Sequence, residues 1–121
     1  MHSIKLKAWY NDNQEIIDID EIDFHHKLIL SHKVPPNYIS LQLKFEDIIF
    51  LKFTSLYDID GNEIYEGDIL CNSSINSLYT KAEVIFLNGC FCVRQLEGKR
   101  LIDNLYNHNS DSRIIGNIFK K

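Results

Sequence analysis

The chain has 121 residues, of which 45% are hydrophobic and 25% are charged, a composition typical of a globular domain with its own core. Its formal net charge of −4 disfavours a protein that grips duplex DNA, because such proteins carry a strong basic excess. No apolar run approaches the ~18 residues that a membrane span needs, and the N-terminal residues lack the apolar region of a signal peptide. We therefore expect a soluble cytoplasmic protein that uses no membrane, no double-stranded DNA and no cofactor.

The first half of the chain predicts strands interrupted by polar turns. Apolar and charged residues alternate over 4–8, the pattern of a half-buried strand. Two more strands are predicted over 15–20 and 24–30, with the acidic block IDIDEID (17–23) on a solvated face. Pro35 and Pro36 break the pattern. The stretch 41–53 fits either a helix or a buried strand, and the sequence leaves both open.

Turn residues are clearer in the second half. Asp60-Gly61 and Asn88-Gly89 each separate two apolar stretches, which predicts hairpin turns, and Glu66-Gly67-Asp68 predicts another tight turn. Strands are expected over 69–71, 82–87, 90–96 and 113–119, with one helical turn near 102–106. Short strands with frequent turns are typical of a sandwich or a small barrel, and the second half has the size of a five-stranded SH3-type barrel.

The stretch DIDGNEIYEGD (58–68) concentrates carboxylates, as a calcium loop or a catalytic acid pair would. An EF-hand loop fails because Glu63 stands where glycine is needed and Ile69 where the bidentate glutamate is needed. A catalytic pair needs one carboxyl with a raised pKa in an apolar pocket, and the sequence supplies no such pocket beside Glu66 and Asp68. We therefore interpret the stretch as two turns, Asp60-Gly61 and Glu66-Gly67-Asp68, in which glycine adopts positive φ and aspartate binds its own backbone.

Four blocks of the chain carry a family resemblance: IKLKAW (4–9), FEDII (45–49), FTSLYDIDGNEIYEGDIL (53–70) and IIGNIF (114–119). In this order they resemble the YopX family, small proteins encoded mainly by phages and prophages of Gram-positive bacteria. The resemblance implies one compact, mainly β unit, with an SH3-like barrel over 45–121 and an N-terminal β-rich portion over 1–44 packed on it. It implies no enzymatic activity. Ser55 replaces the family's usual glycine, so positive φ is not expected there.

Two clusters could hold a metal ion. Cys71, Cys90 and Cys92 could supply three thiolates, with a histidine completing a tetrahedral zinc site, but core packing of small apolar cysteines is the favoured interpretation. Asp23, His25 and His26 supply two ligands at most if they lie on a strand, and a solvated strand rim is favoured. We therefore expect no metal site and no catalytic residue.

The candidate binding surface combines cations and tyrosines. Basic residues on the first strand and near the last ones could form a patch for a phosphate, a nucleotide or an acidic partner, and tyrosines at turns could stack bases or seat peptides. Scattered surface lysines and rings that cover barrel ends are the alternative. The candidate residues are Lys5, Lys7, Tyr57, Tyr65, Tyr79, Lys99, Arg100 and Tyr106, with Lys120 and Lys121 as a further basic pair.

These observations favour a non-enzymatic binding module, a phage accessory protein of the bacterial host cytoplasm that engages a host or phage protein. One alternative is a sponge that sequesters a host nucleotide signal. Another is weak binding of single-stranded nucleic acid through the tyrosines and cations, which would depend steeply on salt. Exposed strand edges would also allow homo-oligomers.

Overall fold

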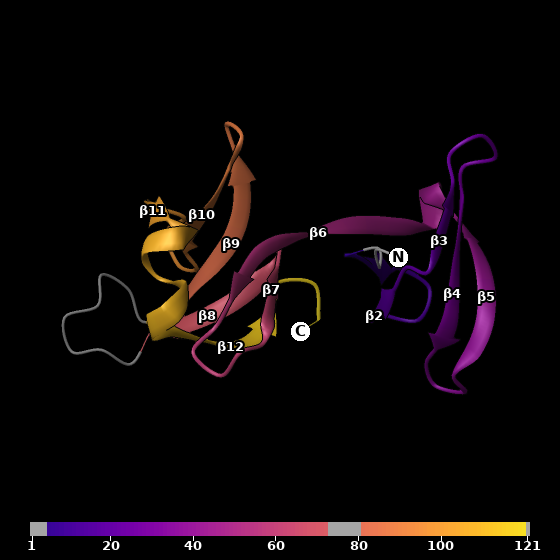
Figure 1. Ribbon diagram of the computed structural model, residues 1–121, viewed down its shortest axis with the longest axis horizontal. Coiled ribbons are helices and arrows are strands. Elements are labelled where there is room, and N and C mark those ends of the chain that lie inside the picture. Colours follow the sequence, from indigo (N-terminus) through magenta and orange to yellow (C-terminus); the bar gives the residue numbers. More distant parts are fainter. Residues whose placement is uncertain (1–4, 73–80, 121) are drawn as a thin grey trace. The chain divides into compact units, whose positions relative to one another are not determined.

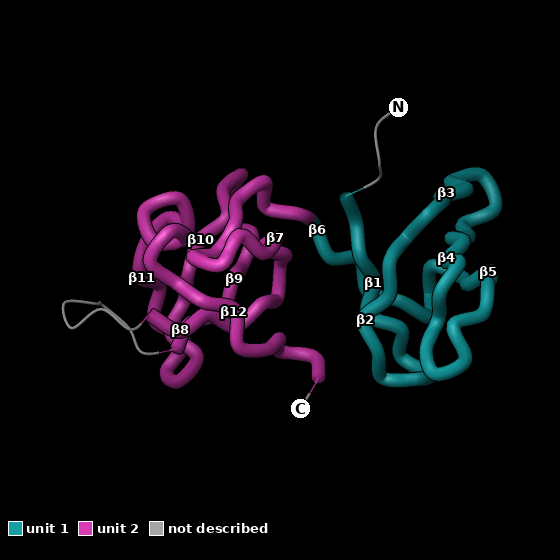
Figure 2. Tube along the Cα trace, turned by 60° about the horizontal axis from the view of Figure 1, so that its bottom comes forward, with its two compact units in different colours: residues 1–52 teal, residues 53–121 magenta. Residues whose placement is uncertain are grey.

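The computed structural model describes residues 5–72 and 81–120 and is built mainly of β-strands (Figure 1). The mainly β fold expected from the sequence is confirmed. Two compact units divide the chain, residues 1–52 and 53–121 (Figure 2). The division falls inside strand β6 (Ile48–Tyr57), whereas the sequence suggested a division between residues 44 and 45. No helix among the described residues is long and apolar enough to cross a membrane.

The first unit contains two antiparallel arrangements. Strand β1 pairs with β2 on one side and with the first half of β6 on the other, while β3, β4 and β5 form a three-stranded sheet in that order. A single 3₁₀ turn, η1 (Phe45–Asp47), leads into β6. The strand bounds are β1 (Leu6–Tyr10), β2 (Glu15–Asp18), β3 (Glu21–Asp23), β4 (Leu28–Val34) and β5 (Ile39–Lys44).

The acidic block 17–23 is only partly solvated, in contrast to the expectation from the sequence. Ile17 and Ile19 are 2% and 3% exposed and belong to the core of the first unit, whereas Asp18 and Asp20 are exposed. Side chains alternate between the two sides of an extended chain. One side of the block is therefore core and only the other is solvated.

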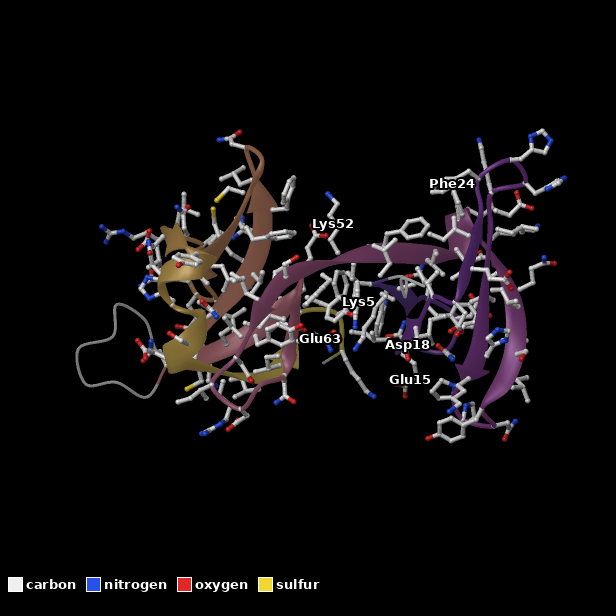
Figure 3. The ribbon with its side chains drawn as sticks, in the orientation of Figure 1. Lys5, Glu15, Asp18, Phe24, Lys52 and Glu63 are labelled. Carbon is white, nitrogen blue, oxygen red and sulfur yellow. The ribbon has the colours of Figure 1, made fainter. Side chains whose placement is uncertain are left out.

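Two expectations for 24–53 also change. The strand expected over 24–30 begins only at Leu28, because the Asp23 carboxylate accepts the backbone N–H of His26 and closes a turn. Phe24 lies in this turn with its side chain 74% exposed (Figure 3). For 41–53, where helix and strand were both open, the structure has two strands, β5 and β6, joined by η1.

The second unit is a five-stranded antiparallel sheet together with a hairpin strand. The sheet order is β11-β10-β9-β8-β12, and β7 pairs with the second half of β6. Two 3₁₀ turns, η2 (Leu105–Asn107) and η3 (Asn109–Asp111), precede the last strand. The strand bounds are β7 (Glu63–Tyr65), β8 (Asp68–Asn72), β9 (Lys81–Leu87), β10 (Cys90–Gln95), β11 (Leu101–Asn104) and β12 (Ser112–Asn117).

The core of the second unit lies on one face of this sheet. Leu70, Val84 and Val93 are at most 1% exposed, and burying each such side chain contributes about 1.5–3 kcal/mol. Leu105 joins the same cluster from η2. The polar segment between β11 and β12 is therefore attached to the core through Leu105.

Gly67 occupies a turn that no other residue fits easily. Its φ is +91°, and a Cβ there would lie 2.8 Å from Cε2 of Phe119. Its backbone N–H donates to the Val84 carbonyl, and its carbonyl accepts the N–H of Ile118. Gly61 is a useful contrast, since its φ is +82° but nothing lies within 4 Å of an added Cβ.

Replacing these two glycines by alanine should separate backbone strain from crowding. We expect Gly61→Ala to cost about 1 kcal/mol for positive φ alone. Gly67→Ala should cost about 1 kcal/mol more, because the Phe119 ring must also move. Urea unfolding of both variants measures this, and equal losses would contradict the contact with Phe119.

Ser55 adopts positive φ although glycine is absent. Its φ is +66°, so the positive-φ turn that the serine put in question is present. The neighbouring Thr54 hydroxyl explains the conformation, because it donates to the Ile64 carbonyl (2.8 Å) and accepts the N–H of Leu56 (3.2 Å). These bonds hold the chain on both sides of Ser55.

Ser55→Gly should therefore stabilise the protein. A non-glycine residue pays about 1–2 kcal/mol in the left-handed region, and glycine's greater freedom in the unfolded chain offsets about half of the gain. We expect a net increase of about 0.5–1 kcal/mol in the free energy of unfolding. A decrease would show that the serine side chain itself stabilises this turn.

Candidate functional site

The acidic stretch 58–68 is organised by the buried carboxylate of Asp58, which is 5% exposed. Its Oδ1 accepts the backbone N–H groups of Asp60 (3.0 Å) and Asn62 (2.9 Å), and its Oδ2 accepts that of Ile114 (3.1 Å). Burial alone would raise the pKa of Asp58, but these hydrogen bonds outweigh it and hold the pKa below its ordinary value. The carboxylate therefore joins the β6–β7 turn to β12.

Two other carboxylates of this stretch are also engaged by the chain. Asp60 pairs with Arg113 at 2.7 Å, with side chains 45% and 58% exposed, and Asp68 accepts the backbone N–H of Tyr65 at 2.7 Å. These contacts stabilise turns. They favour the turn interpretation of the stretch over a catalytic acid pair.

The β9–β10 hairpin ends in three apolar side chains, of which Phe86 and Phe91 pair on one face of the sheet and Leu87 lies on the other. Asn88 and Gly89 have φ values of +52° and +81°, as a two-residue type I′ turn requires. Phe86 and Leu87, directly before the turn, are 40% and 42% exposed, and the ring of Phe86 packs on Phe91 at a centroid distance of 4.9 Å. We call Phe86, Leu87 and Phe91 the hairpin tip, which extends beyond the neighbouring strands of its unit in Figure 1.

A buried ion group lies further along the same hairpin. The Glu83 side chain is 2% exposed and binds Arg94 at 2.7 Å and Lys99 at 2.9 Å. Burial raises the pKa of Glu83, but hydrogen bonds and charge from Lys99 and Arg94 lower it more, so the net pKa is below its ordinary value. Lys99, a candidate binding residue, thus has a structural role through its ammonium group.

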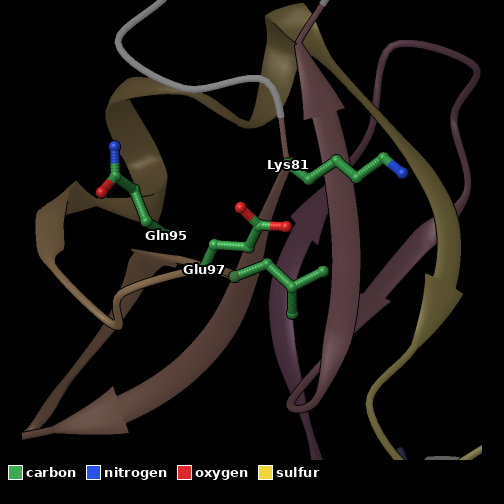
Figure 4. Close-up of a pocket in the computed structure, with 4 residues that line it drawn as sticks. Lys81, Gln95 and Glu97 are labelled. Carbon is green, nitrogen blue, oxygen red and sulfur yellow. The ribbon is translucent and has the colours of Figure 1, made fainter.

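Two hollows flank Gln95 in the second unit. The larger, of about 500 Å³, is lined among the described residues by Lys81, Gln95, Leu96 and Glu97 (Figure 4). The smaller, of about 210 Å³, is lined by Gln95, Arg100, Leu101 and Ile102. The larger hollow has the size of a small-molecule site. Its wall carries one cation, Lys81, and one carboxylate, Glu97. These opposite charges favour neither an anionic nor a cationic ligand.

The residues of the candidate binding surface are distributed over both units. Lys5 and Lys7 belong to the first unit, and Tyr57, Tyr65, Lys99, Arg100 and Tyr106 belong to the second. Tyr106 is 76% exposed and Tyr57 is 48% exposed, whereas Tyr65 is 5% exposed and packs against Phe53. Tyr79 and Lys121 lie outside the described residues. Of the pairs proposed, only Lys99 and Arg100 share one turn, between β10 and β11.

The cysteines do not assemble as a set of three. Cys71 is on β8, Cys90 and Cys92 are on β10, and β9 lies between these strands. In the described part of the chain, no three His, Cys, Asp or Glu side chains gather as a metal site. Cys90 and Cys92 are nevertheless close, with their sulfur atoms 3.8 Å apart.

Asp23 is the last residue of β3, and His25 and His26 lie in the turn that follows it. His26 Nδ1 is 2.7 Å from Asp23 Oδ2, and the His25 ring packs edge-on against that of His26. The backbone and side chain of His26 hold the pKa of Asp23 below its ordinary value. The aspartate is therefore used to close the turn.

Comparisons with known proteins place this geometry in context. A family model described as YopX protein matches residues 5–121. The crystal structure of protein EF1440 from Enterococcus faecalis is similar, with a TM-score of 0.61 and 21% sequence identity over 98% of this chain and 96% of that chain. This identity supports a shared fold only. A search of curated proteins finds no match.

Removing the Asp58 carboxylate should cost far more than removing that of Asp60. Asp58→Ala leaves three backbone N–H groups without their acceptor, two of them in the β6–β7 turn. It should lower the free energy of unfolding by about 3 kcal/mol or more at pH 7. Asp60→Ala removes an exposed ion pair and should cost less than about 1 kcal/mol. Urea unfolding measures both, and equal losses would contradict the role of Asp58.

The contribution of Asp58 to stability should depend on pH. Because folding lowers the pKa of Asp58, its contribution is fully present above the unfolded pKa of about 3.9 and is lost as pH falls through the folded value. The stability difference between the wild type and Asp58→Ala should therefore shrink below about pH 4. A difference that is constant into this acidic range would contradict the assignment.

Proposed function

This chain belongs to the YopX family, and on that premise we propose that it is a non-enzymatic phage or prophage accessory protein. In this proposal it works in the host cytoplasm and binds a host or phage protein through the hairpin tip. The observation that carries the proposal is the exposure of Phe86 and Leu87, 40% and 42%, at the closed end of a hairpin. Exposed apolar clusters of this kind are typical of interaction sites.

The chemistry of the tip favours a protein partner. Phe86 and Phe91 form an aromatic pair, and aromatic residues are enriched in the centres of protein interfaces. The chain also carries a net charge of −4, which opposes association with a polyanion. The Asn88-Gly89 turn fixes the hairpin, so little ordering is needed on binding.

The contacts of the acidic stretch 58–68 support a non-enzymatic role in this proposal. Asp58, Asp60 and Asp68 hold backbone groups or Arg113 within the fold. Carboxylates engaged in this way are poorly placed to transfer protons to a substrate. The stretch that most invited an enzymatic interpretation thus has a structural explanation.

For the second unit we propose an SH3-like barrel. Five short antiparallel strands in the order β11-β10-β9-β8-β12 support this architecture, as does a core on one sheet face that includes Val84, Val93 and Leu105. Small barrels of this size commonly bind partners through loops and hairpins beside the sheet. The hairpin tip is such a position.

A nucleotide sponge is the second candidate, and the larger hollow is the observation that favours it. Its volume of about 500 Å³ suits a nucleotide, and the smaller hollow carries Arg100. Glu97 in the larger wall opposes a phosphate group. We therefore place the sponge second, and weak binding of single-stranded nucleic acid through Arg100 and Tyr106 third.

Native mass spectrometry of tagged protein from phage-infected host cells tests these candidates together. We expect a protein-sized additional mass on the wild type that a Phe86→Ser/Leu87→Ser variant loses. A Tyr106→Ala variant is the matched control, because it removes a side chain that is 76% exposed in the same unit. It should retain the partner.

Three results would contradict binding through the tip. The partner could survive the double substitution, or it could be lost equally in the Tyr106 control. An additional mass of nucleotide size that disappears with Arg100→Ala would support the sponge instead. Thermal unfolding of each purified variant ensures that a lost partner does not reflect a lost fold.

A further inference from the structure

Two thiols and one amide oxygen converge on the face of β10 and β11 opposite the core, where Cys92 is buried and Cys90 is partly exposed. Cys90 and Cys92 are two residues apart on β10 and share one face. Asn104 lies directly opposite Cys92 in the β10–β11 register. The Asn104 Oδ1 is 3.1 Å from Cys90 Sγ and 3.9 Å from Cys92 Sγ, and the two sulfur atoms are 3.8 Å apart.

These distances match one face of a tetrahedral coordination sphere. Two sulfur atoms bound to one zinc ion at about 2.3 Å stand about 3.8 Å apart when the angle between them is tetrahedral. An oxygen bound at about 2.1 Å stands about 3.6 Å from each sulfur in the same geometry. The observed triangle needs shifts of about 0.5 Å or less to reach that arrangement.

We propose that Cys90, Cys92 and Asn104 bind one thiophilic divalent cation of the zinc class, with water in the fourth position. Each thiol loses its proton to solvent as its sulfur forms a bond to the metal. The Asn104 carbonyl oxygen donates a lone pair, and no atom changes oxidation state. Two thiolates neutralise the dication, as zinc sites in proteins commonly require.

The surroundings favour a cation. Asp103 stands next to Asn104 on β11 and adds a negative charge close to the site. A dication bound there is attracted by both thiolates and by the Asp103 carboxylate.

The arrangement differs from the three-cysteine site considered in the sequence. Cys71 is excluded because β9 separates its strand from β10. The third donor is the side-chain amide oxygen of Asn104 in place of a third thiolate. Cys71 therefore serves as a control thiol within the same unit.

Competition between the reduced full-length protein and a chromophoric chelator for Zn²⁺ tests the proposal. We expect one Zn²⁺ per chain for the wild type and for Cys71→Ser. Cys90→Ser and Cys92→Ser should each weaken binding by at least about tenfold. Asn104→Asp should strengthen it, because a carboxylate replaces the weaker amide ligand, a gain that a purely structural role would not produce.

Alkylation of the wild type provides a test that needs no substitution. Iodoacetamide treatment followed by peptide mass spectrometry should show the partly exposed Cys90 protected by Zn²⁺, with Cys71 unaffected. The proposal is overturned if the wild type takes up no Zn²⁺, if Cys71→Ser abolishes uptake, or if Zn²⁺ leaves the alkylation of Cys90 unchanged.

Discussion

The buried carboxylate of Asp58 links the beginning of the second unit to its last strand. Asp58 spans 56 residues of chain when it accepts the N–H of Ile114, and it shapes the β6–β7 turn with its other oxygen. The backbone adds a parallel link, since Ile59 N–H donates to the Ser112 carbonyl. Two stretches of the family resemblance, 53–70 and 114–119, are thus the two that this carboxylate joins. Both the β6–β7 turn and the position of β12 depend on it.

Local patterns in the sequence anticipated most strands because the turns carry their own chemistry. Asn88-Gly89 could be placed from two residues, since they fill positive φ with little strain. The stretch 24–30 was harder, because the turn there depends on Asp23 binding the N–H of His26. Ser55 shows the same limit, since Thr54 holds its unusual backbone through a bond to β7. Contacts between strands are not visible in a local pattern.

The candidate site was less predictable than the fold. Tyr65 and Tyr106 look alike in the sequence, yet they are 5% and 76% exposed. Alternation along β9 and β10 places Phe86 and Phe91 on the face of the sheet that carries the core. They lie next to the Asn88-Gly89 turn, beyond the core residues Val84 and Val93. The opposite side of β10 carries Cys90 and Cys92. A single hairpin therefore presents two chemically different surfaces, which only the strand register reveals.

Strand β6 pairs with β1 through its first half and with β7 through its second half. One extended segment of ten residues thus provides a paired strand in both units. The conformational entropy lost when this segment becomes ordered serves the pairing of two sheets. A chain cut at the division would leave each fragment with half a strand. A local change in the backbone of β6 therefore bears on the strand pairing of both units.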